Sequence, residues 1–218
     1  IYRGTPSADV VATQMNQIQA AAEASRLGIP VVVISNPRNH PLAFPIEGEG
    51  QFSFWPDTLG FAATRDSRLI RRFGEIAAKE WRAAGIHKMY GYSADVATDP
   101  LWARNQETFG ENPELISGMI SNVIKGFQGD VLNENSVSMT VKHVPGGGAR
   151  AEGRDPHFEE GQFNIYPTPG SLLKYHIPPF IAAIESEATS IMPYYAYPSN
   201  DSAEQGLPHF SNTQQFEE

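Results

Sequence analysis

The feature that most constrains the fold is a regular alternation of short apolar runs with longer amphipathic stretches. Runs rich in β-branched and aromatic residues predict four strands, over residues 29–35, 87–94, 136–141 and 189–195. The first run is short, rich in β-branched residues and bounded by Pro30 and Asn36, so we expect it to be a buried strand. Residues 1–3 would add a fifth strand if they are the remnant of one.

The stretches between these runs have the spacing of helices. Apolar residues at helical intervals predict helices over residues 9–27, 64–85, 112–126 and, interrupted around two prolines, 171–187. Asp66 and Asn112 are suited to cap two of them, and Pro113 suits a first helical position. Strands that alternate with helices at this spacing predict parallel β/α units in an α/β domain.

Composition narrows the class of protein. The chain has 218 residues, of which 40% are hydrophobic and 19% are charged, values typical of one globular domain or a large piece of one. A formal net charge of −9 argues against a nucleic-acid partner. No apolar run approaches the roughly 18 residues of a membrane span. The absence of cysteine excludes disulfides and thiolate metal sites.

Polar side chains follow the predicted strands where each strand ends. They are Asn36, Tyr92, Ser93, Asp95, Lys142, His143, Tyr194 and Tyr195. The active site of a (β/α)8 barrel lies at this end of its strands, and an open doubly wound sheet binds ligands there too. A closed barrel needs eight strands, so either the sheet is open or the chain is incomplete.

The strand over residues 136–141 delivers Lys142 and His143 into a glycine-rich loop, followed by a second charged cluster at residues 153–157. Cationic groups at the end of a buried strand are costly to desolvate without a partner. This pattern favours a site for a polar ligand over a structural ion-pair network.

Four segments together resemble one known family. Residues 94–104 and 107–113 read ADVATDPLWAR and ETFGENP, similar to the "DVARDPRWGR…ETFGEDP" signature of family 3 glycoside hydrolases. Residues 142–148 (KHVPGGG), 54–66 (FWPD…GFAATRD) and 191–195 (IMPYY) resemble the "KHFPGGG", "FP…GLAATRD" and "VMpSYN" segments. They occur in the family's order, so the chain is identified as a member of this β-glucosidase family.

The resemblance implies a (β/α)8 TIM-type barrel that hydrolyses terminal β-D-glucosyl residues with retention of configuration. Residues 1–218 would then form an incomplete barrel domain with about the first five β/α units. Retention needs two carboxylates about 5 Å apart. The family's nucleophile lies in a Ser-Asp motif, a dipeptide that does not occur here. We therefore expect no catalytic residue in this chain, with nucleophile and acid/base beyond Glu218. The other implied partners are a β-glucoside or oligosaccharide and the remaining C-terminal part of the enzyme.

The family's sugar-binding residues carry over to matching positions. Arg104 matches an arginine that bonds sugar hydroxyls, and Lys142 and His143 match a pair that holds hydroxyls at the far edge of the ring. Tyr195 matches the tyrosine beside the nucleophile, and Met192 lies on the same strand and is expected to line the pocket. Two alternatives stay open: an ion pair of Arg104 with Glu107, Glu111 or Asp99, and a purely structural, buried His143.

Asn36 stands where the family places an aspartate that clamps two sugar hydroxyls. An amide still donates and accepts hydrogen bonds but lacks the charged bidentate acceptor. The specificity for the sugar at that end is therefore open, and Arg38 or His40 could substitute.

Arg154, Asp155 and His157 raise a rival within the family. The β-N-acetylglucosaminidase branch uses an Asp-x-His pair on this loop as its acid/base, but that branch has a second histidine where Gly147 stands here. We expect the three residues instead to shape the loop or touch a hydroxyl of a β-glucoside.

A third alternative is a barrel fragment that binds carbohydrate without cleaving it. The histidines show no i, i+4 pair and no nucleotide-binding glycine motif is present, so neither a metal nor a cofactor is expected. The family resemblance implies a periplasmic or secreted location.

Overall fold

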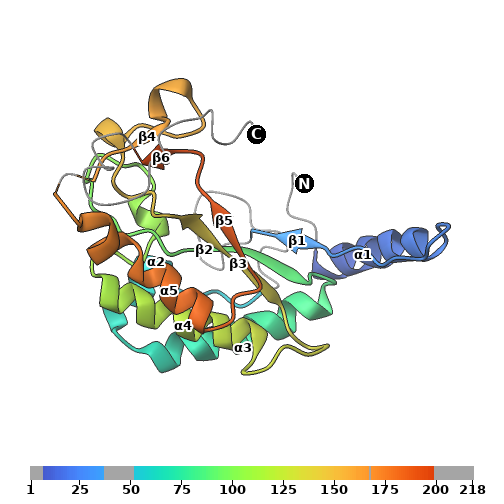
Figure 1. Cartoon of the computed structure of the whole chain (residues 1–218). Helices are drawn as coiled ribbons and strands as arrows, with labels where there is room; N and C mark the ends of the chain where they lie inside the picture. The colour runs from blue at the N-terminus through green and yellow to red at the C-terminus, as the bar shows by residue number, and fades with distance from the viewer. Residues whose placement is uncertain (1–6, 37–51, 167, 199–218) are drawn as a thin grey trace.

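The computed structural model describes residues 7–36, 52–166 and 168–198. Its centre is a four-stranded, entirely parallel sheet whose strands lie side by side in sequence order (Figure 1). These strands are β1 (Ile34–Ser35), β2 (Lys88–Ser93), β3 (Ser138–Val144) and β5 (Ser190–Pro193). The predicted parallel α/β architecture is confirmed.

Helices connect successive strands and cover one face of the sheet (Figure 1). The three that pack there are α3 (Ser67–Ala83), α4 (Pro113–Gln128) and α5 (Pro178–Glu185). Two further helices are α1 (Ala8–Glu23) and α2 (Thr58–Thr64). Because each helix returns the chain to the start of the next strand, the carboxyl ends of all four strands share one edge.

Several short elements lie at that edge of the sheet (Figure 1). A two-stranded parallel sheet pairs β4 (Phe163–Asn164) with β6 (Tyr197–Pro198). Single turns of 3₁₀ or π helix make up the rest: η1 (Asn105–Glu107), η2 (Ala151–Gly153), η3 (Glu159–Gly161) and η4 (Leu172–His176).

The predicted helix caps are present. The Asp66 carboxylate accepts from the backbone N–H groups of Arg68 and Leu69, and Asn112 Oδ1 accepts from the N–H of Leu115. The helix predicted over residues 64–85 is α3, which starts later than predicted, because Thr64 belongs to the end of α2. Arg65 has a φ of 53°, in the left-handed region, which ends α2 before Asp66 starts α3.

The core lies between the sheet and the helices and is rich in aromatic rings. The ring of Phe73 lies 4.9 Å from Phe61 and 5.7 Å from Phe127, and Trp81 lies 5.3 Å from Phe127. All four are almost completely buried. Each such side chain contributes about 1.5–3 kcal/mol through burial, so this cluster holds α3 and α4 on the sheet.

The prediction of a buried strand over residues 29–35 is wrong. Only Ile34 and Ser35 pair with β2, and Val32 is 64% exposed. The reason is tertiary: within the part of the chain that the structure describes, β1 has a neighbouring strand on one side alone, and α1 extends away from the helical layer (Figure 1). Burial on both faces was inferred from the valine-rich run, but among the described residues Val33 packs against the core while Val32 and Ile34 stay exposed.

The strand expected at residues 1–3 falls outside the described residues. In the segment before α2, the Trp55 ring lies 5.4 Å from the Phe73 ring, on the core. In the ranges that the structure describes, no helix has the length and hydropathy needed to cross a membrane.

Candidate functional site

The site is built on the end of β3. In the sheet register, Lys142 lies level with Ser93 of β2 and Met192 of β5. The ladder between β3 and β5 is irregular from Lys142 to Val144. Successive side chains of a regular strand point to opposite faces, whereas an irregular ladder re-aims them. Lys142 and His143 consequently line the same hollow.

This hollow has a volume of about 200 Å³. Seven of the nine predicted site residues line it: Asn36, Arg104, Lys142, His143, His157, Met192 and Tyr195. Three more lining residues, Tyr90, Pro193 and Tyr194, were not predicted for the site. The other two predicted residues, Arg154 and Asp155, line a neighbouring hollow of about 300 Å³. That these side chains bind sugar stays a prediction.

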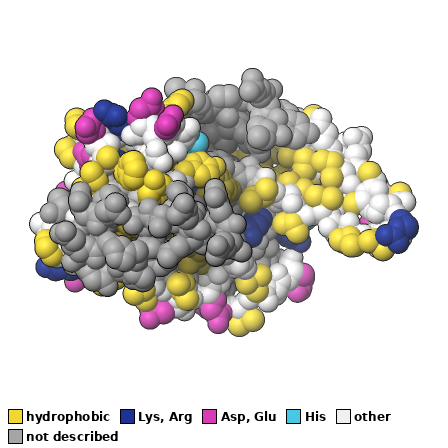
Figure 2. Space-filling view, turned by 45° about the horizontal axis from the view of Figure 1, so that its top comes forward, with side chains coloured by type: hydrophobic (Ala, Val, Ile, Leu, Met, Phe, Trp, Pro, Cys, Tyr) yellow, Lys and Arg dark blue, Asp and Glu magenta, His cyan; other side chains and the backbone are white. Residues whose placement is uncertain are grey.

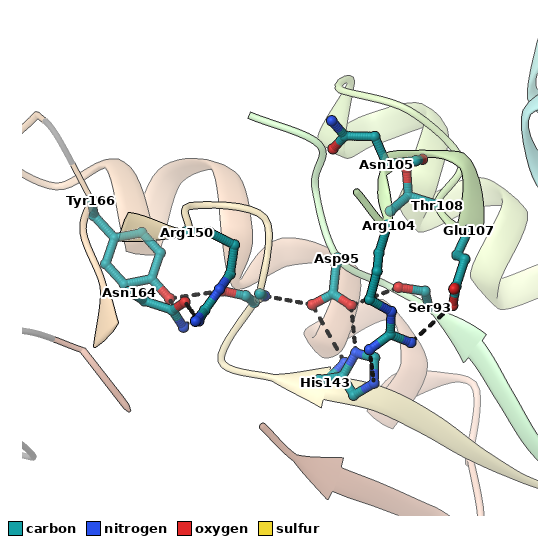
Figure 3. Close-up of polar contacts among 12 residues, drawn as sticks. Ser93, Asp95, Arg104, Asn105, Glu107, Thr108, His143, Arg150, Asn164 and Tyr166 are labelled. Atoms are coloured by element: carbon teal, nitrogen blue, oxygen red, sulfur yellow. Dashed lines mark hydrogen bonds and ion pairs between the residues drawn. The ribbon is translucent and has the colours of Figure 1, made fainter. Parts of the chain in front are cut away.

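Arg104 reaches the hollow from the segment between β2 and α4 (Figure 3). Its Nη2 donates to Glu107 Oε2 at 2.8 Å, so the ion pair left open by the sequence is present, and its Nη1 lies 3.4 Å from His143 Nε2. Burial acts to lower the pKa of Arg104, but the bond to Glu107 outweighs it and the pKa lies above its ordinary value. A charged donor therefore faces the hollow.

Lys142 is almost completely buried, at 4% exposure. Its ammonium lies 4.4 Å from the centroid of the Tyr90 ring, a cation–π contact. The sequence reading missed Tyr90. The sequence does place Tyr90 on a strand next to the one that carries Lys142. The strand register that brings the two side chains together is not visible in the sequence.

His143 is fixed by a fully buried carboxylate. Its Nδ1 lies 2.7 Å from Asp95 Oδ2, and its backbone N–H donates to Asp95 Oδ1 at 3.4 Å (Figure 3). Ser93 Oγ donates to the same carboxylate at 2.6 Å. Asp95 was noted at a strand end but not predicted as a site residue, because its partner His143 lies 48 residues away along the chain.

These contacts set the charge state of the pair. Burial alone would raise the pKa of Asp95, but hydrogen bonds from His143 and Ser93 outweigh it and hold the pKa below its ordinary value. Burial lowers the pKa of His143, and nearby Arg104 adds to the effect against the opposing pull of Asp95. At neutral pH the carboxylate is therefore charged and the imidazole neutral.

The glycine-rich loop makes close approaches. The Gly147 N–H donates to Asp95 Oδ1 at 2.5 Å, and a Cβ on Gly147 would overlap the Tyr194 ring. The Tyr194 ring in turn lies 4.6 Å from the His143 ring. A glycine here lets the loop close over the Asp95–His143 pair.

A second buried polar cluster supports the loop from behind (Figure 3). Arg150 Nη1 donates to Asn164 Oδ1 at 2.6 Å, and Tyr166 Oη donates to the Gly146 carbonyl at 2.9 Å. The Arg150 guanidinium also lies 5.3 Å from the centroid of the Tyr194 ring. This cluster could not be predicted from the sequence, since its members belong to no motif and resemble ordinary loop residues.

Asp155 and His157 form a separate, half-exposed pair. His157 Nδ1 lies 2.5 Å from Asp155 Oδ1, and the imidazole packs edge-on against the Tyr195 ring at 5.0 Å. The imidazole lines the main hollow, whereas the carboxyl group lines the neighbouring one.

Asn36 is exposed and lines the hollow from the end of β1, whereas Arg38 and His40 lie outside the described residues. Among the side chains that the structure describes, no group of three or more metal-ligating residues is arranged to hold a metal ion.

Comparison with known proteins agrees with this arrangement. The sequence model of the family described as "Glycosyl hydrolase family 3 N terminal domain" matches residues 6–213. Probable beta-glucosidase C of Aspergillus flavus is 45% identical over 186 residues, which cover 84% of this chain and 29% of that protein. Periplasmic beta-glucosidase/beta-xylosidase of Dickeya chrysanthemi is 40% identical over 196 residues, covering 88% of this chain and 30% of that protein.

The fold is shared with solved structures as well. The crystal structure of β-glucosidase from Listeria innocua in complex with glucose superposes with a TM-score of 0.73 at 26% identity, covering 86% of this chain and 24% of that one. The parallel α/β architecture is thus that of a TIM-like barrel domain, while the number of β/α units stays a prediction. The chain spans about 30% of the length of the two curated relatives. It belongs to the family of glycosyl hydrolase family 3 N-terminal domains.

Proposed function

We propose that this chain supplies the sugar-binding side of the −1 pocket in a retaining β-glucosidase acting on terminal, non-reducing β-D-glucosyl residues. Two similarities support the proposal: the relatives carry β-glucosidase names, and the Listeria innocua enzyme was crystallised with glucose. The "periplasmic" name of the Dickeya chrysanthemi relative supports a periplasmic or secreted location.

The observation that carries the proposal is the convergence of three nitrogen-bearing side chains on one hollow. Arg104, Lys142 and His143 meet there from two segments of the chain. Sugar hydroxyls accept hydrogen bonds from the charged donors Arg104 and Lys142, and charge-assisted bonds of this kind are roughly twice as strong as neutral ones. The tyrosine rings that complete the lining offer apolar surface to the C–H faces of a pyranose.

The residues lining the described part of this hollow include no aspartate or glutamate. Retaining hydrolysis requires two carboxylates about 5 Å apart across the scissile bond. We therefore propose that the nucleophile and acid/base come from elsewhere in the whole enzyme. Residues 1–218 would be the incomplete barrel domain that grips the sugar.

The sugar-binding role is testable on this chain. In a titration with glucose followed by two-dimensional NMR, we expect chemical-shift changes around the hollow. Lys142→Ala should weaken binding by about tenfold or more, since a charge-assisted bond is worth about 1.5–3 kcal/mol. Lys79→Ala, at an exposed position of α3, is the matched control and should bind as the parent does. Equal affinities of all three proteins would remove Lys142 from the pocket.

The missing carboxylates give a second test. We expect this chain alone to show no hydrolysis of an aryl β-glucoside. Measurable turnover would contradict the proposal that the nucleophile and acid/base come from elsewhere in the whole enzyme. If the whole protein also binds glucose yet cleaves no glycoside, the third alternative, a non-catalytic carbohydrate-binding barrel, is correct.

One observation favours a second candidate function, β-N-acetylglucosaminidase activity with an Asp-x-His acid/base. The Asp155–His157 pair is formed, and His157 lines the hollow. In that case His157→Ala in the whole enzyme would collapse kcat and leave sugar binding intact. We expect only a small effect on kcat, because we assign the pair to the loop and not to proton transfer.

A further inference from the structure

Asp95 is a polar group of the site that is fully buried and hydrogen-bonded at both carboxylate oxygens. Its side chain is completely buried, and both oxygens accept hydrogen bonds from other parts of the chain. Ser93 Oγ and His143 Nδ1 contact Oδ2 at 2.6 and 2.7 Å, and the Gly147 N–H donates to Oδ1 at 2.5 Å. No described side of this carboxylate faces the hollow, so its effect on a ligand must act through its partners.

The partners of the two imidazole nitrogens determine where the proton of His143 lies. Arginine has only donors, so His143 Nε2, 3.4 Å from Arg104 Nη1, must be the acceptor of that contact. An ionised carboxylate only accepts, so Nδ1 must carry the hydrogen that points at Asp95. The two contacts therefore specify the same tautomer independently.

We propose that Asp95 is a positioning residue that holds His143 in the Nδ1–H tautomer and thereby presents Nε2 to the hollow as a hydrogen-bond acceptor. The titratable and charged groups that face the imidazole are Asp95, Arg104, Lys142 and Tyr194. Burial and the charges of Arg104 and Lys142 lower the pKa of His143 and outweigh the opposing effect of Asp95, so the imidazole is neutral. The same carboxylate fixes the Gly147 amide, so it couples the imidazole to the loop.

A consequence for specificity follows, and it rests on the proposed function. When a ligand displaces the long, 3.4 Å contact with Arg104, the single lone pair of Nε2 accepts from a substrate group that donates a hydrogen, as a sugar hydroxyl does. Arg104 and Lys142 supply only donors, so Nε2 is the complementary element that distinguishes a hydroxyl from a group that can only accept.

The tautomer can be measured directly on the whole chain without any ligand. In ¹⁵N-labelled protein at neutral pH, we expect Nδ1 of His143 to show the shift of a protonated nitrogen and Nε2 that of an unprotonated one. Signals are assigned by their loss in His143→Gln. The opposite pattern in the parent chain would overturn the proposal, whatever any variant does.

Substitutions test the role of Asp95 itself. Asp95→Asn should weaken the preference for Nδ1–H, because the amide can donate to Nδ1 and only the longer, 3.4 Å contact with Arg104 still favours that tautomer. Asp155→Asn is the matched control: it changes the same chemistry beside His157 and should leave the His143 signals unchanged. An unaltered tautomer in a folded Asp95→Asn variant would also overturn the proposal. If that variant does not fold, Ser93→Ala, which removes one donor from the carboxylate, should shift the His143 signals, and no shift would count against the role.

Glucose analogues separate this inference from the proposed function. The hydroxyl that contacts His143 is the one whose replacement no longer changes the affinity in His143→Ala. At that carbon, the fluoro-sugar should bind the parent chain as weakly as the deoxy-sugar. Both should bind about tenfold or more weakly than glucose. A fluoro-sugar that keeps most of the affinity would mean that Nε2 donates. If no glucose analogue binds but the tautomer is as expected, the positioning role of Asp95 stands and the proposed function fails.

Discussion

At the scale of single residues, the site depends on polar groups that are buried behind it. His176 is an example: it packs edge-on to Tyr166 at 4.9 Å, and a Cβ on Gly146 would lie 2.8 Å from the Cβ of His176. Burial lowers the pKa of His176 to about 4, against an opposing effect of the Asp95 charge. Its imidazole is therefore neutral in the folded chain.

This gives a prediction for the pH dependence of stability. The unfolded chain binds a proton at His176 near its ordinary pKa of about 6.5, whereas the folded chain does so only near pKa 4. Stability is therefore lost as pH falls through this window, by about 2 kcal/mol between pH 7 and pH 5 for this residue. In urea unfolding, His176→Leu should show a loss smaller by that amount. Ser171→Ala, a neighbouring buried site that does not titrate, should keep the full loss. Equal pH dependence in both variants would refute the assignment.

At the scale of elements, α3 and α4 are held unusually close. A Cβ on Gly126 would lie 2.5 Å from the carbonyl oxygen of Arg71 and 2.9 Å from the Cα of Gly74. Backbone atoms cannot move aside as a flexible side chain can. The packing of the two helices therefore depends on the absence of a side chain at this contact.

Two alanine substitutions in α4 test this contact. Gly126→Ala should lower the free energy of unfolding by about 1–3 kcal/mol, the usual cost of overpacking. Gly118→Ala, in the same helix with open space around its Cβ, should raise it by about 0.5–1 kcal/mol. Thermal or urea unfolding measures both. A stabilising effect at both positions would show that the helices have room to separate.

The elements also show what the sequence could predict. Capping by Asp66 and Asn112 and the parallel β/α order follow from local chemistry and were predicted correctly. The exposure of β1 was not predictable, because it depends on which layers cover a strand. Lys142 was placed at the strand end by its motif, but its contact with Tyr90 depends on strand register.

Only part of the candidate site could be predicted from the sequence, for the same reason. Side chains within recognisable motifs, such as Arg104 and His143, were predicted to converge, and the structure brings them together. Asp95 stands 48 residues before His143 in the chain, and nothing local announces that contact. Supporting residues such as Arg150 belong to no motif at all.

At the scale of the whole molecule, apolar side chains gather along α1 and the segment after it, where the chain extends from the body (Figures 1 and 2). The exposed members are Val10, Ile18, Leu27, Ile29, Val31, Val32 and Ile34. An exposed apolar surface next to an edge strand is a liability for association.

We therefore expect Val32→Lys to extend the range of concentrations over which the chain stays monomeric in light scattering. A lysine beside an edge strand opposes pairing with another chain. Val131→Lys adds the same charge at an exposed valine between α4 and β3 and should change nothing. An equal gain from both variants would attribute the effect to net charge.

The Asp95 carboxylate joins a side chain at the rim of the hollow to the amide of a loop residue. Two segments tied to one buried ion are thermodynamically linked, and linkage is reciprocal. A contact that orders the glycine-rich loop should then increase the affinity of the hollow for its ligand. An occupant must, to the same degree, protect the loop amides from exchange with solvent.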